Sequence, residues 1–356
     1  MNPFARTVAW LLGLLLASTA HANEAGWTQV RIDGASAGAP ATTVALYYPT
    51  TATPRAIPMG PFTLDVAIQG EPAARVKGLI LLSHGIGGSE LGHSVIAQAL
   101  ARDGYLVAAL RHPGDNWQDS SLWEQGPAHY LDERPRQVSR VIDAMLADPR
   151  WKDRIESDAR GPRVGAIGHS AGGYTVLALA GATTDLARIR DHCRDEAADD
   201  PIFCGMSRRA TASATVTATT APMERATTTA TGAVLAPPST SVKDERIRAI
   251  VALAPMAVPF TAGSLSAVGA STMVYEAELD RFLVPRFHAE WVARNLPAAH
   301  LHRVPNAWHF AFMDTPTRPV PSADGDVAAN PPGFDREAFL KKLGDEIAAF
   351  FDETLR

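Results

Sequence analysis

The spacing of apolar residues changes character near residue 76. From Trp27 to about Ile68, apolar residues alternate with other residues and are punctuated by proline and glycine, which predicts antiparallel strands. From Val76 onward, short continuous apolar runs alternate with segments whose apolar residues recur at helical spacing. Strands that alternate with helices predict an α/β fold, with a doubly wound, mostly parallel sheet covered by helices on both faces.

The second pattern can be divided into individual elements. Buried strands are predicted over residues 76–83, 105–110, 163–167, 248–253 and 272–275, with a further strand around 300–302. Helices are predicted over 91–103, 134–148, 171–180, 286–295 and 335–351. Residues from about 183 to 241 interrupt the alternation: a loop-like segment with both cysteines precedes an Ala/Thr-rich stretch, 210–236. This insertion is either a surface loop or a lid over an active site.

Residues 1–22 have the pattern of a cleavable export signal. Arg6 supplies a positive charge, Val8 to Ala17 form a short apolar run, and Ala20-His21-Ala22 fits a small-x-small cleavage site. The run is about half as long as the roughly 20 apolar residues that a membrane-spanning helix needs. We therefore expect cleavage after Ala22, a mature domain over residues 23–356 with no membrane span, and a periplasmic or secreted location.

Charge and cysteine content narrow the choice of partners. The net charge of the 356 residues is −5 and no dense basic tract is present, which argues against nucleic acid as a partner. Cys193 and Cys204 are the two cysteines, and an oxidising compartment favours a disulfide between them over two free thiols. His192 alone does not complete a metal-binding set with them. The oligomeric state stays open.

A candidate nucleophile lies where a predicted strand meets a predicted helix. Residues 168–172 read Gly-His-Ser-Ala-Gly, which matches G-x-S-x-G with Ser170 at its centre. In that context a sharp turn exposes the serine hydroxyl, and small flanking residues relieve crowding. The alternative, a glycine-rich turn with an incidental serine, does not explain why strand and helix flank the motif so closely.

A serine hydroxyl needs a general base, and in this arrangement the chain order is serine, acid, histidine. The histidines after Ser170 are His192, His288, His300, His302 and His309. The first lies in the insertion, the second inside a predicted helix, and the next two on one face of a strand. His309 lies on a loop after a strand and is therefore the predicted base.

The acid and the oxyanion donors follow from the same chain order. Asp280, on the loop after residues 272–275, is the predicted acid, and Glu276 and Glu278 are the alternatives. Developing negative charge on the substrate oxygen needs preorganised donors. We expect these to be the backbone N–H groups of Ala171 and of Ile86, which lies in a glycine-rich loop (SHGIGG, 83–88) after the first buried strand.

Together these segments resemble a known group. They are residues 83–88 (SHGIGG), 111–116 (RHPGDN), 133–135 (ERP), 168–173 (GHSAGG) and 308–310 (WHF). This set resembles bacterial predicted dienelactone hydrolases of the α/β-hydrolase superfamily, which are related to platelet-activating-factor acetylhydrolases. The resemblance implies the α/β-hydrolase fold and ester hydrolysis without a metal or organic cofactor. It also matches His112, Asp115 and Arg134, for which we expect structural roles near the site.

The resemblance has two departures. Dienelactone hydrolases proper use a cysteine nucleophile, whereas this chain has Ser170. The platelet-activating-factor enzymes place the acid after an earlier strand, where this chain reads Ala-Leu-Ala-Pro (252–255) without a carboxylate. That difference favours Asp280.

The combined prediction is an exported serine hydrolase that cleaves a small-molecule carboxylic ester through an acyl-enzyme. One alternative is an amidase, peptidase or acyltransferase that uses the same triad. Another is a non-catalytic binding protein on the same fold. Trp117, Trp123 and Trp308 either line an apolar pocket or pack in the core.

Overall fold

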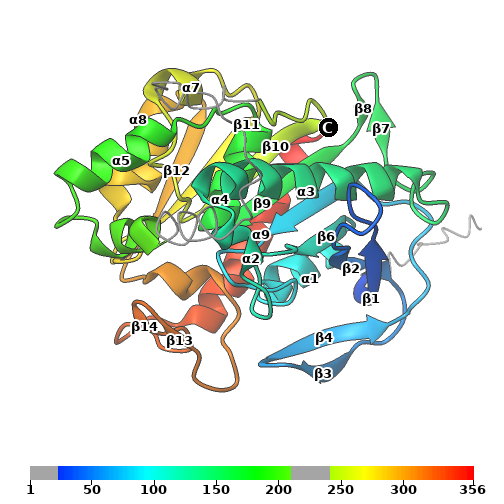
Figure 1. Ribbon diagram of the computed structural model, residues 1–356. Coiled ribbons are helices and arrows are strands. Elements are labelled where there is room, and N and C mark those ends of the chain that lie inside the picture. Colours follow the sequence, from blue (N-terminus) through cyan, green and yellow to red (C-terminus); the bar gives the residue numbers. More distant parts are fainter. Residues whose placement is uncertain (1–22, 210–240) are drawn as a thin grey trace, which may run out of the picture.

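The computed structural model describes residues 23–209 and 241–356. The predicted export signal and the Ala/Thr-rich stretch lie outside the described residues. The largest sheet has ten strands in the order β12-β11-β10-β9-β5-β6-β2-β1-β4-β3 (Figure 1). Within the described residues, no helix combines the length and the apolar character that crossing a bilayer requires.

Six neighbouring strands form the parallel part of the sheet. They are β5 (Leu79–Ser83), β6 (Leu106–Arg111), β9 (Val164–His169), β10 (Ile247–Leu253), β11 (Ser271–Ala277) and β12 (Ala299–Val304). Every residue of β5 and β9 is buried, as expected for strands covered on both faces. The prediction of a mostly parallel sheet is confirmed. The first of these strands begins three residues later than expected, because Val76 forms an isolated bridge with Ile155.

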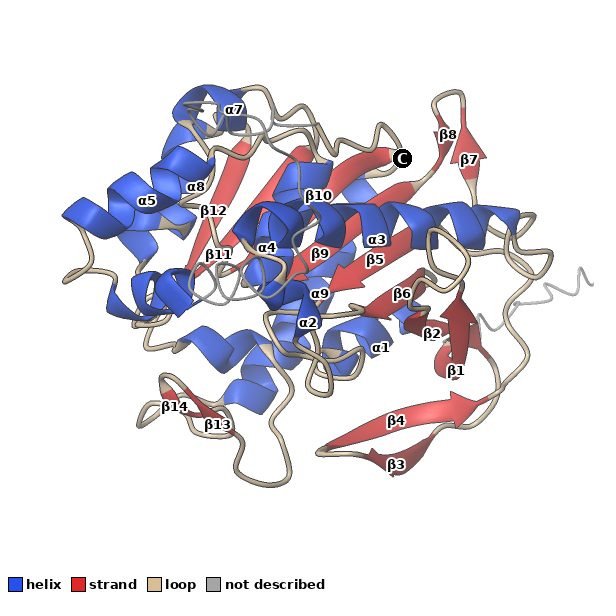
Figure 2. Cartoon of the chain, viewed as in Figure 1, coloured by secondary structure: helices blue, strands red, loops and turns tan. Residues whose placement is uncertain are grey.

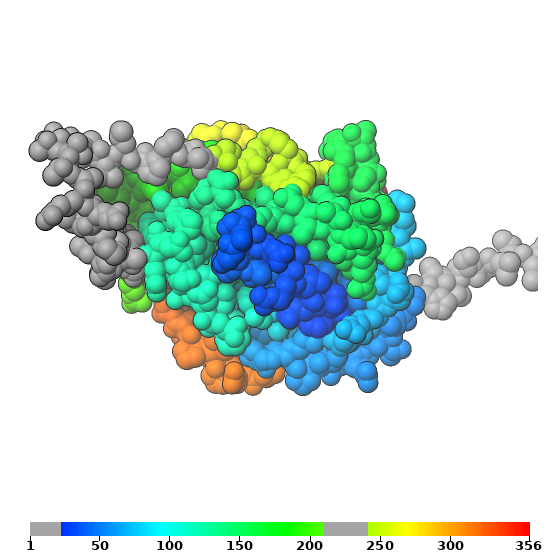
Figure 3. Space-filling view, turned by 45° about the vertical axis from the view of Figure 1, so that its right-hand side comes forward, coloured from blue at the N-terminus to red at the C-terminus, as the bar shows by residue number. Residues whose placement is uncertain are grey.

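The N-terminal strands are β1 (Glu24–Ile32), β2 (Thr42–Thr50), β3 (Arg55–Met59) and β4 (Phe62–Ile68). β2 pairs antiparallel with both β1 and β6, and β3 with β4, as the alternating pattern predicted. Two short hairpins, β7 (Ser157–Asp158) with β8 (Gly161–Pro162) and β13 (Pro321–Ser322) with β14 (Gly325–Asp326), lie apart from the large sheet. Residues of the N-terminal segment (blue) are visible on the face shown in Figure 3, although every residue of β2 except Thr43 is buried.

Helices cover both faces of the sheet (Figure 2). One apolar core contains residues of α3 (Pro127–Ala147), α4 (Ala171–Leu179) and α8 (Ala289–Asn295). The opposite core contains residues of α1 (Ser94–Arg102) and α9 (Arg336–Thr354). The chain runs from β5 outward to β6 and then returns to the other side of β5 for β9. The carboxyl ends of β5 and β9 therefore flank the switch point, where this kind of sheet binds its ligands.

Two helix predictions had wrong boundaries. The helix predicted over 134–148 begins at Pro127, whose fixed φ suits a first helical position. The helix predicted over 286–295 is divided into a 3₁₀ turn, η1 (Pro285–Phe287), and α8, because His288 has non-helical angles (φ −122°, ψ −93°). Shorter helical turns are α2 (Ser121–Glu124), α7 (Ala262–Ser266) and η2 (His309–Phe312).

The segment with the cysteines is helical, so the prediction of a loop was wrong. It contains α5 (Leu186–Asp195) and a further helix over 201–209. The Asp185 side chain accepts the Ala187 N–H and caps α5. Cys193 in α5 and Cys204 in the second helix form a disulfide bond, as expected. We call residues 185–209 the helical cap.

Candidate active site

Ser170 occupies a strained turn between β9 and α4. Its φ of 58° and ψ of −117° are uncommon for a residue other than glycine. Two backbone hydrogen bonds fix this conformation: the Ser170 N–H donates to the Leu253 carbonyl (2.9 Å), and the Met256 N–H donates to the Ser170 carbonyl (3.0 Å). This strand–turn–helix geometry is that of the nucleophile elbow.

Glycines beside Ser170 allow an unusually close backbone approach. A Cβ at Gly168 would lie 2.0 Å from the Gly172 carbonyl oxygen, and one at Gly172 would lie 1.9 Å from the Ser83 oxygen. A Cβ at Gly173 would lie 2.6 Å from Pro255 Cα. The turn is therefore packed against the end of β5 and the loop after β10, and side chains at these positions would push it away.

His309 and Asp280 come together on the loops after β12 and β11. His309 Nδ1 lies 2.7 Å from Asp280 Oδ2, and both side chains are buried. Asp280 Oδ1 accepts the N–H groups of Phe282 and Leu283, each at 2.8 Å. The Phe282 ring stacks on the imidazole with 4.8 Å between centroids and 14° between planes. The carboxylate therefore orients the imidazole, and the aromatic ring restricts its rotation.

The alternative acids make other contacts. Glu276 pairs with Arg303 (Nε to Oε1, 2.9 Å), and Glu278 accepts the Asn306 N–H at 2.9 Å. His302, on β12, stacks on Tyr275 with centroids 4.8 Å apart. Of the three carboxylates considered from the sequence, the structure thus joins Asp280 to His309.

A second histidine connects the turn of Ser170 to the loop of His309. His169 Nε2 donates to the His309 carbonyl oxygen at 3.0 Å, and the two rings lie 4.8 Å apart. Burial lowers the pKa of His169 well below its ordinary value, and nearby His309 adds to the effect. A neutral His169, the residue directly before Ser170, therefore binds the backbone of His309.

The glycine-rich loop after β5 lies against Ser170. A Cβ at Gly85 would be 3.1 Å from the Ser170 Cβ. The Gly88 N–H donates to the Gly85 carbonyl (3.2 Å), so Ile86 and Gly87 form a tight turn in which Gly87 has a φ of +63°. Ala171 is the first residue of α4, and N–H groups of a first helical turn have no acceptor within the helix. Ala171 therefore follows Ser170 in the chain, and the loop that contains Ile86 approaches Ser170 at Gly85.

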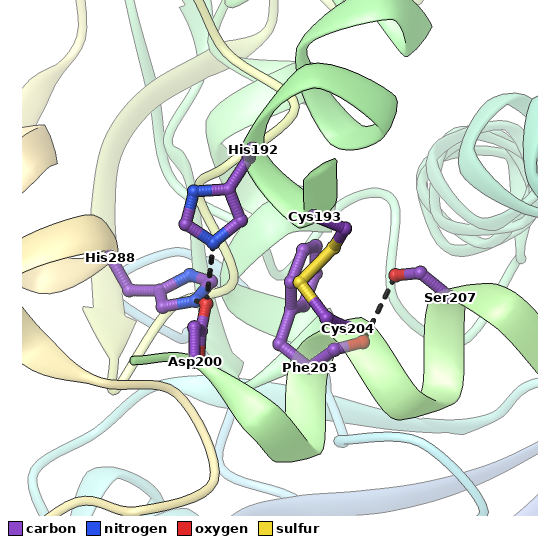
Figure 4. The surroundings of a disulfide bond; sticks show 7 residues. All are labelled: His192, Cys193, Asp200, Phe203, Cys204, Ser207 and His288. Atoms are coloured by element: carbon purple, nitrogen blue, oxygen red, sulfur yellow. Dashed lines mark hydrogen bonds and ion pairs between the residues drawn. A yellow bond between two sulfur atoms is a disulfide. The ribbon is translucent and has the colours of Figure 1, made fainter. Parts of the chain in front are cut away.

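His192 and His288 both bind Asp200, at the helical cap (Figure 4). Their Nε2 atoms lie 2.9 and 3.0 Å from Asp200 Oδ2, and His288 Nδ1 accepts the Ala257 N–H at 3.1 Å. These histidine contacts lower the pKa of Asp200 to about 2, although its burial alone would raise that pKa. His288 therefore lies in a polar junction between the cap and the loop after β10, and not inside a helix as predicted.

The cap also packs on Phe282, which stacks on His309. Phe203 and Cys204 form an apolar cluster with Val258, Phe282 and Leu283. Because Phe282 stacks on His309, the disulfide-bonded helices support the imidazole from behind. The sequence held a signal for these helices, since the apolar residues Leu186, Ile189 and Cys193 recur at helical spacing.

The three tryptophans lie in different surroundings. Trp123 packs against Tyr130 with ring centroids 4.6 Å apart, at the edge of a core cluster. The Arg281 guanidinium lies over the Trp308 ring, 5.2 Å from its centroid. Trp117 is 64% exposed, and its backbone N–H donates to the carbonyl of Gly88 in the glycine-rich loop (3.2 Å). Core packing thus accounts for Trp123 and not for Trp117.

In the described part of the chain, no group of three or more histidine, cysteine or acidic side chains is arranged to hold a metal ion.

Residues 79–321 match the sequence model of the alpha/beta hydrolase family. The chain belongs to the α/β-hydrolase family. This match confirms the predicted α/β-hydrolase fold.

The fold is also that of a solved esterase structure. A ferulic acid esterase from Streptomyces cinnamoneus is similar over 95% of this chain and 92% of its own, with 17% identity and a TM-score of 0.58. A predicted CIB-like hydrolase from Thermoplasma acidophilum covers 91% of this chain and 99% of its own, with 13% identity and a TM-score of 0.44. No curated protein sequence matches the chain.

Proposed function

We propose that this α/β-hydrolase is an exported serine esterase with Ser170 as nucleophile, His309 as general base and Asp280 as the acid. The observation that carries the proposal is the 2.7 Å contact between His309 Nδ1 and Asp280 Oδ2 beside the strained turn of Ser170. A buried carboxylate bound to Nδ1 fixes the tautomer that leaves Nε2 free to accept the serine proton.

The proposed reaction has two steps. His309 takes the proton of Ser170 as Oγ attacks the ester carbonyl, and the N–H groups of Ile86 and Ala171 stabilise the oxyanion. The tetrahedral intermediate collapses, the alcohol leaves with the proton from His309, and an acyl-enzyme remains. Water, activated by His309, attacks the acyl-enzyme and releases the carboxylic acid and free Ser170.

The choice of an ester substrate rests on two further observations. The similar Streptomyces protein is a ferulic acid esterase, although its identity of 17% carries only the fold. The segments SHGIGG, RHPGDN and GHSAGG resemble those of predicted dienelactone hydrolases, and we propose that grouping as well. Neither observation selects an acyl group, so the test must survey a range of small esters.

The test is hydrolysis of p-nitrophenyl esters from acetate to palmitate, and of methyl ferulate, by residues 23–356. We expect activity that disappears in Ser170→Ala and persists in Ser266→Ala, a control on the exposed face of α7. A fluorophosphonate probe should label the wild type and not Ser170→Ala. A folded wild-type protein that neither hydrolyses these esters nor reacts with the probe would refute the proposal and favour a binding protein.

Two additional assays separate the alternatives that share the triad. Anilides with matched acyl groups would be cleaved faster than the esters if the protein were an amidase. Added alcohol acceptors would give new esters in place of free acid if it were an acyltransferase. Hydrolysis of the ester alone supports the esterase.

We also propose export through the signal of residues 1–22. The full chain should appear outside the cytoplasm of a bacterial host, with Asn23 as its first residue. Recovery of uncleaved chain from the cytoplasm would contradict this part of the proposal and leave the esterase assignment unaffected.

A further inference from the structure

We propose that Asp115, held by Arg134, is a positioning residue that fixes the oxyanion loop, residues 84–88, in its catalytic conformation. The inference rests on the proposed function and deepens it. It assigns a kinetic role to a buried ion pair that touches neither Ser170 nor His309 in any hydrogen bond of the described residues.

The two carboxylate oxygens of Asp115 bind different groups. Oδ1 accepts the N–H of Gly87 at 2.9 Å, in the turn that contains Ile86. Oδ2 accepts the Tyr130 hydroxyl at 2.7 Å and also binds Arg134 Nη1. Asp115 is 1% exposed and Arg134 is fully buried. One side of the carboxylate therefore holds the loop, while the other side fixes the carboxylate itself.

Arg134 connects the loop to the helix of the nucleophile. Its Nη2 donates to the His84 carbonyl oxygen and to Ser83 Oγ, the latter at 3.2 Å. Its Nε donates to Thr175 Oγ1 at 3.2 Å, and that hydroxyl donates to the Ala171 carbonyl oxygen at 2.9 Å. A single guanidinium thus binds the backbone at the start of the loop and, through Thr175, the first residue of α4. The two expected oxyanion donors, on Ile86 and Ala171, are connected through it.

The hydrogen bonds determine the protonation of His84. Its Nε2 accepts the His112 N–H at 3.1 Å, so its Nδ1 must donate to the Gly85 carbonyl at 2.6 Å. Burial lowers the pKa of His84 to about 4, and the positive charge of Arg134 adds to the effect. The imidazole is therefore neutral near pH 7 and holds a second backbone group of the same turn.

The same reasoning applies to His112. Gln137 Nε2 donates to the Pro113 carbonyl at 3.1 Å, so Gln137 Oε1 accepts a hydrogen bond from His112 Nδ1–H at 2.7 Å. His112 Nε2 then accepts the Ser83 hydroxyl at 2.8 Å. Burial lowers the pKa of His112 well below its ordinary value, and Arg134 adds to the effect. With both imidazoles neutral, Asp115 supplies the negative charge that Arg134 needs in this network.

These contacts bear directly on oxyanion stabilisation. The Gly87 N–H and the Gly85 carbonyl are bound, whereas the Ile86 N–H has no acceptor among the described residues. A loop with three glycines is intrinsically free to rearrange. Donors stabilise a developing charge well only when they need not reorganise during the reaction. Asp115 and Arg134 therefore keep the Ile86 N–H in place before substrate arrives.

The sharpest test compares an ester with its thionoester, in which sulfur replaces the carbonyl oxygen. Sulfur is larger and a weaker hydrogen-bond acceptor, so a well-formed oxyanion hole favours the ester. In Asp115→Asn we expect kcat to fall by about 10- to 100-fold, with KM changing by less than about threefold. The wild-type preference for the ester over the thionoester should fall by about tenfold. Both substrates report on the same folded molecules, so their ratio is independent of the amount that folds.

Glu90→Gln is the matched control. Glu90 is a buried carboxylate two residues beyond the loop, and it pairs with Arg111 and accepts from Gln29 Nε2. This variant should keep the wild-type ester preference. Arg134→Lys is the second test, because a lysine retains the charge but cannot reach all of the groups that Arg134 binds; its preference should lie between those of wild type and Asp115→Asn.

An unchanged ester preference in Asp115→Asn and Arg134→Lys, with kcat reduced, would show that the pair serves stability alone and would overturn the inference. An equal loss of preference in Glu90→Gln would overturn it as well. If Asp115→Asn fails to fold, Arg134→Lys decides. Failure of the esterase proposal is distinguishable, since the wild type would then lack activity that depends on Ser170.

Discussion

The two sides of the candidate site are held by different kinds of contact. On the base side, one carboxylate and an aromatic stack orient His309, and an apolar cluster with a disulfide-bonded pair of helices supports the stack. On the oxyanion side, a buried ion pair, Asp115 with Arg134, and two neutral histidines hold the glycine-rich loop.

This difference in contacts predicts how substitutions on each side of the site affect activity and stability. Apolar contacts can be removed one at a time, and each loss costs free energy according to the cavity that it leaves. A buried ionic network behaves otherwise, because removing one partner leaves a charge without compensation in a poorly solvated place. We therefore expect substitutions on the base side to separate activity from stability, and substitutions on the oxyanion side to affect both.

The largest expected effect is on the base side. Asp280→Asn should lower kcat by about 10⁴-fold, because the amide no longer selects the required tautomer of His309. The urea midpoint should change little, since the asparagine oxygen can still accept the N–H groups of Phe282 and Leu283. Glu278→Gln, on the same loop but bonded to Asn306, is the control and should stay within about threefold of wild type. Equal losses in the two variants would remove Asp280 from the triad.

On the oxyanion side, the next effect is on stability. Arg134→Met should lower the free energy of unfolding by about 4 kcal/mol, because Asp115 is left charged and buried. Replacing both partners, as Arg134→Met with Asp115→Asn, removes both charges and should recover part of that loss. Urea unfolding of Arg134→Met, Asp115→Asn and the double variant measures the difference. A double variant less stable than the wild type by the sum of the losses of Arg134→Met alone and Asp115→Asn alone would show that the charges are not coupled.

The disulfide of the helical cap should matter for stability and little for catalysis. Cys193 and Cys204 are 11 positions apart, and opening so short a loop should cost about 3 kcal/mol through the unfolded chain. The double variant Cys193→Ala with Cys204→Ala should unfold at lower urea and keep kcat within about threefold. A reductant should shift the wild type to the same extent and leave the double variant unchanged. A large loss of kcat would mean that the disulfide, and not the apolar packing of the cap, keeps Phe282 against His309.

Local signals in the sequence were sufficient to predict the turn at Ser170 and the contact between Asp280 and His309. The elbow of Ser170 is specified by glycines whose absent side chains permit contact with Ser83 and Pro255, and a glycine pattern is visible in a sequence. The positions of Asp280 and His309 followed from chain order and from strands that could be recognised by their apolar runs. The parallel core of the sheet was predictable for the same reason.

The contacts on the oxyanion side were not predictable in this way. Arg134 and Asp115 are 19 positions apart, and Arg134 and His84 are 50 apart, so no local spacing indicates that they meet. A resemblance to a family suggested only that they lie near the site. The helices of the cap were missed because charged residues outnumber apolar ones in α5, and packing on Val258 and Phe282 compensates for that composition.

The smallest predicted effect concerns pH, and it belongs to the oxyanion side. His93 is the N-cap residue of α1, after the glycine-rich loop. It is buried, and neither ring nitrogen has a hydrogen-bond partner among the described residues. Burial, with His84 nearby, lowers the pKa of His93 to about 3. In the unfolded chain a histidine has a pKa of about 6.5. The unfolded state therefore binds the proton first, and stability falls as pH drops below about 6.5.

For one such group the free energy of unfolding falls by about 1.5 kcal/mol between pH 6.5 and pH 5. His93→Leu removes the imidazole without breaking a hydrogen bond. Between pH 6.5 and pH 5, the free energy of unfolding of this variant should therefore fall by about 1.5 kcal/mol less than that of the wild type. His129→Leu, on the exposed surface of α3, is the control and should keep the wild-type dependence. Urea unfolding at the two pH values measures all three proteins.

If His93→Leu kept the full wild-type dependence, the acid sensitivity would have to come from the other buried histidines, of which His84 and His112 hold the oxyanion loop. In that case acid would weaken the loop directly, and the oxyanion side would respond to pH through the same contacts that position Ile86.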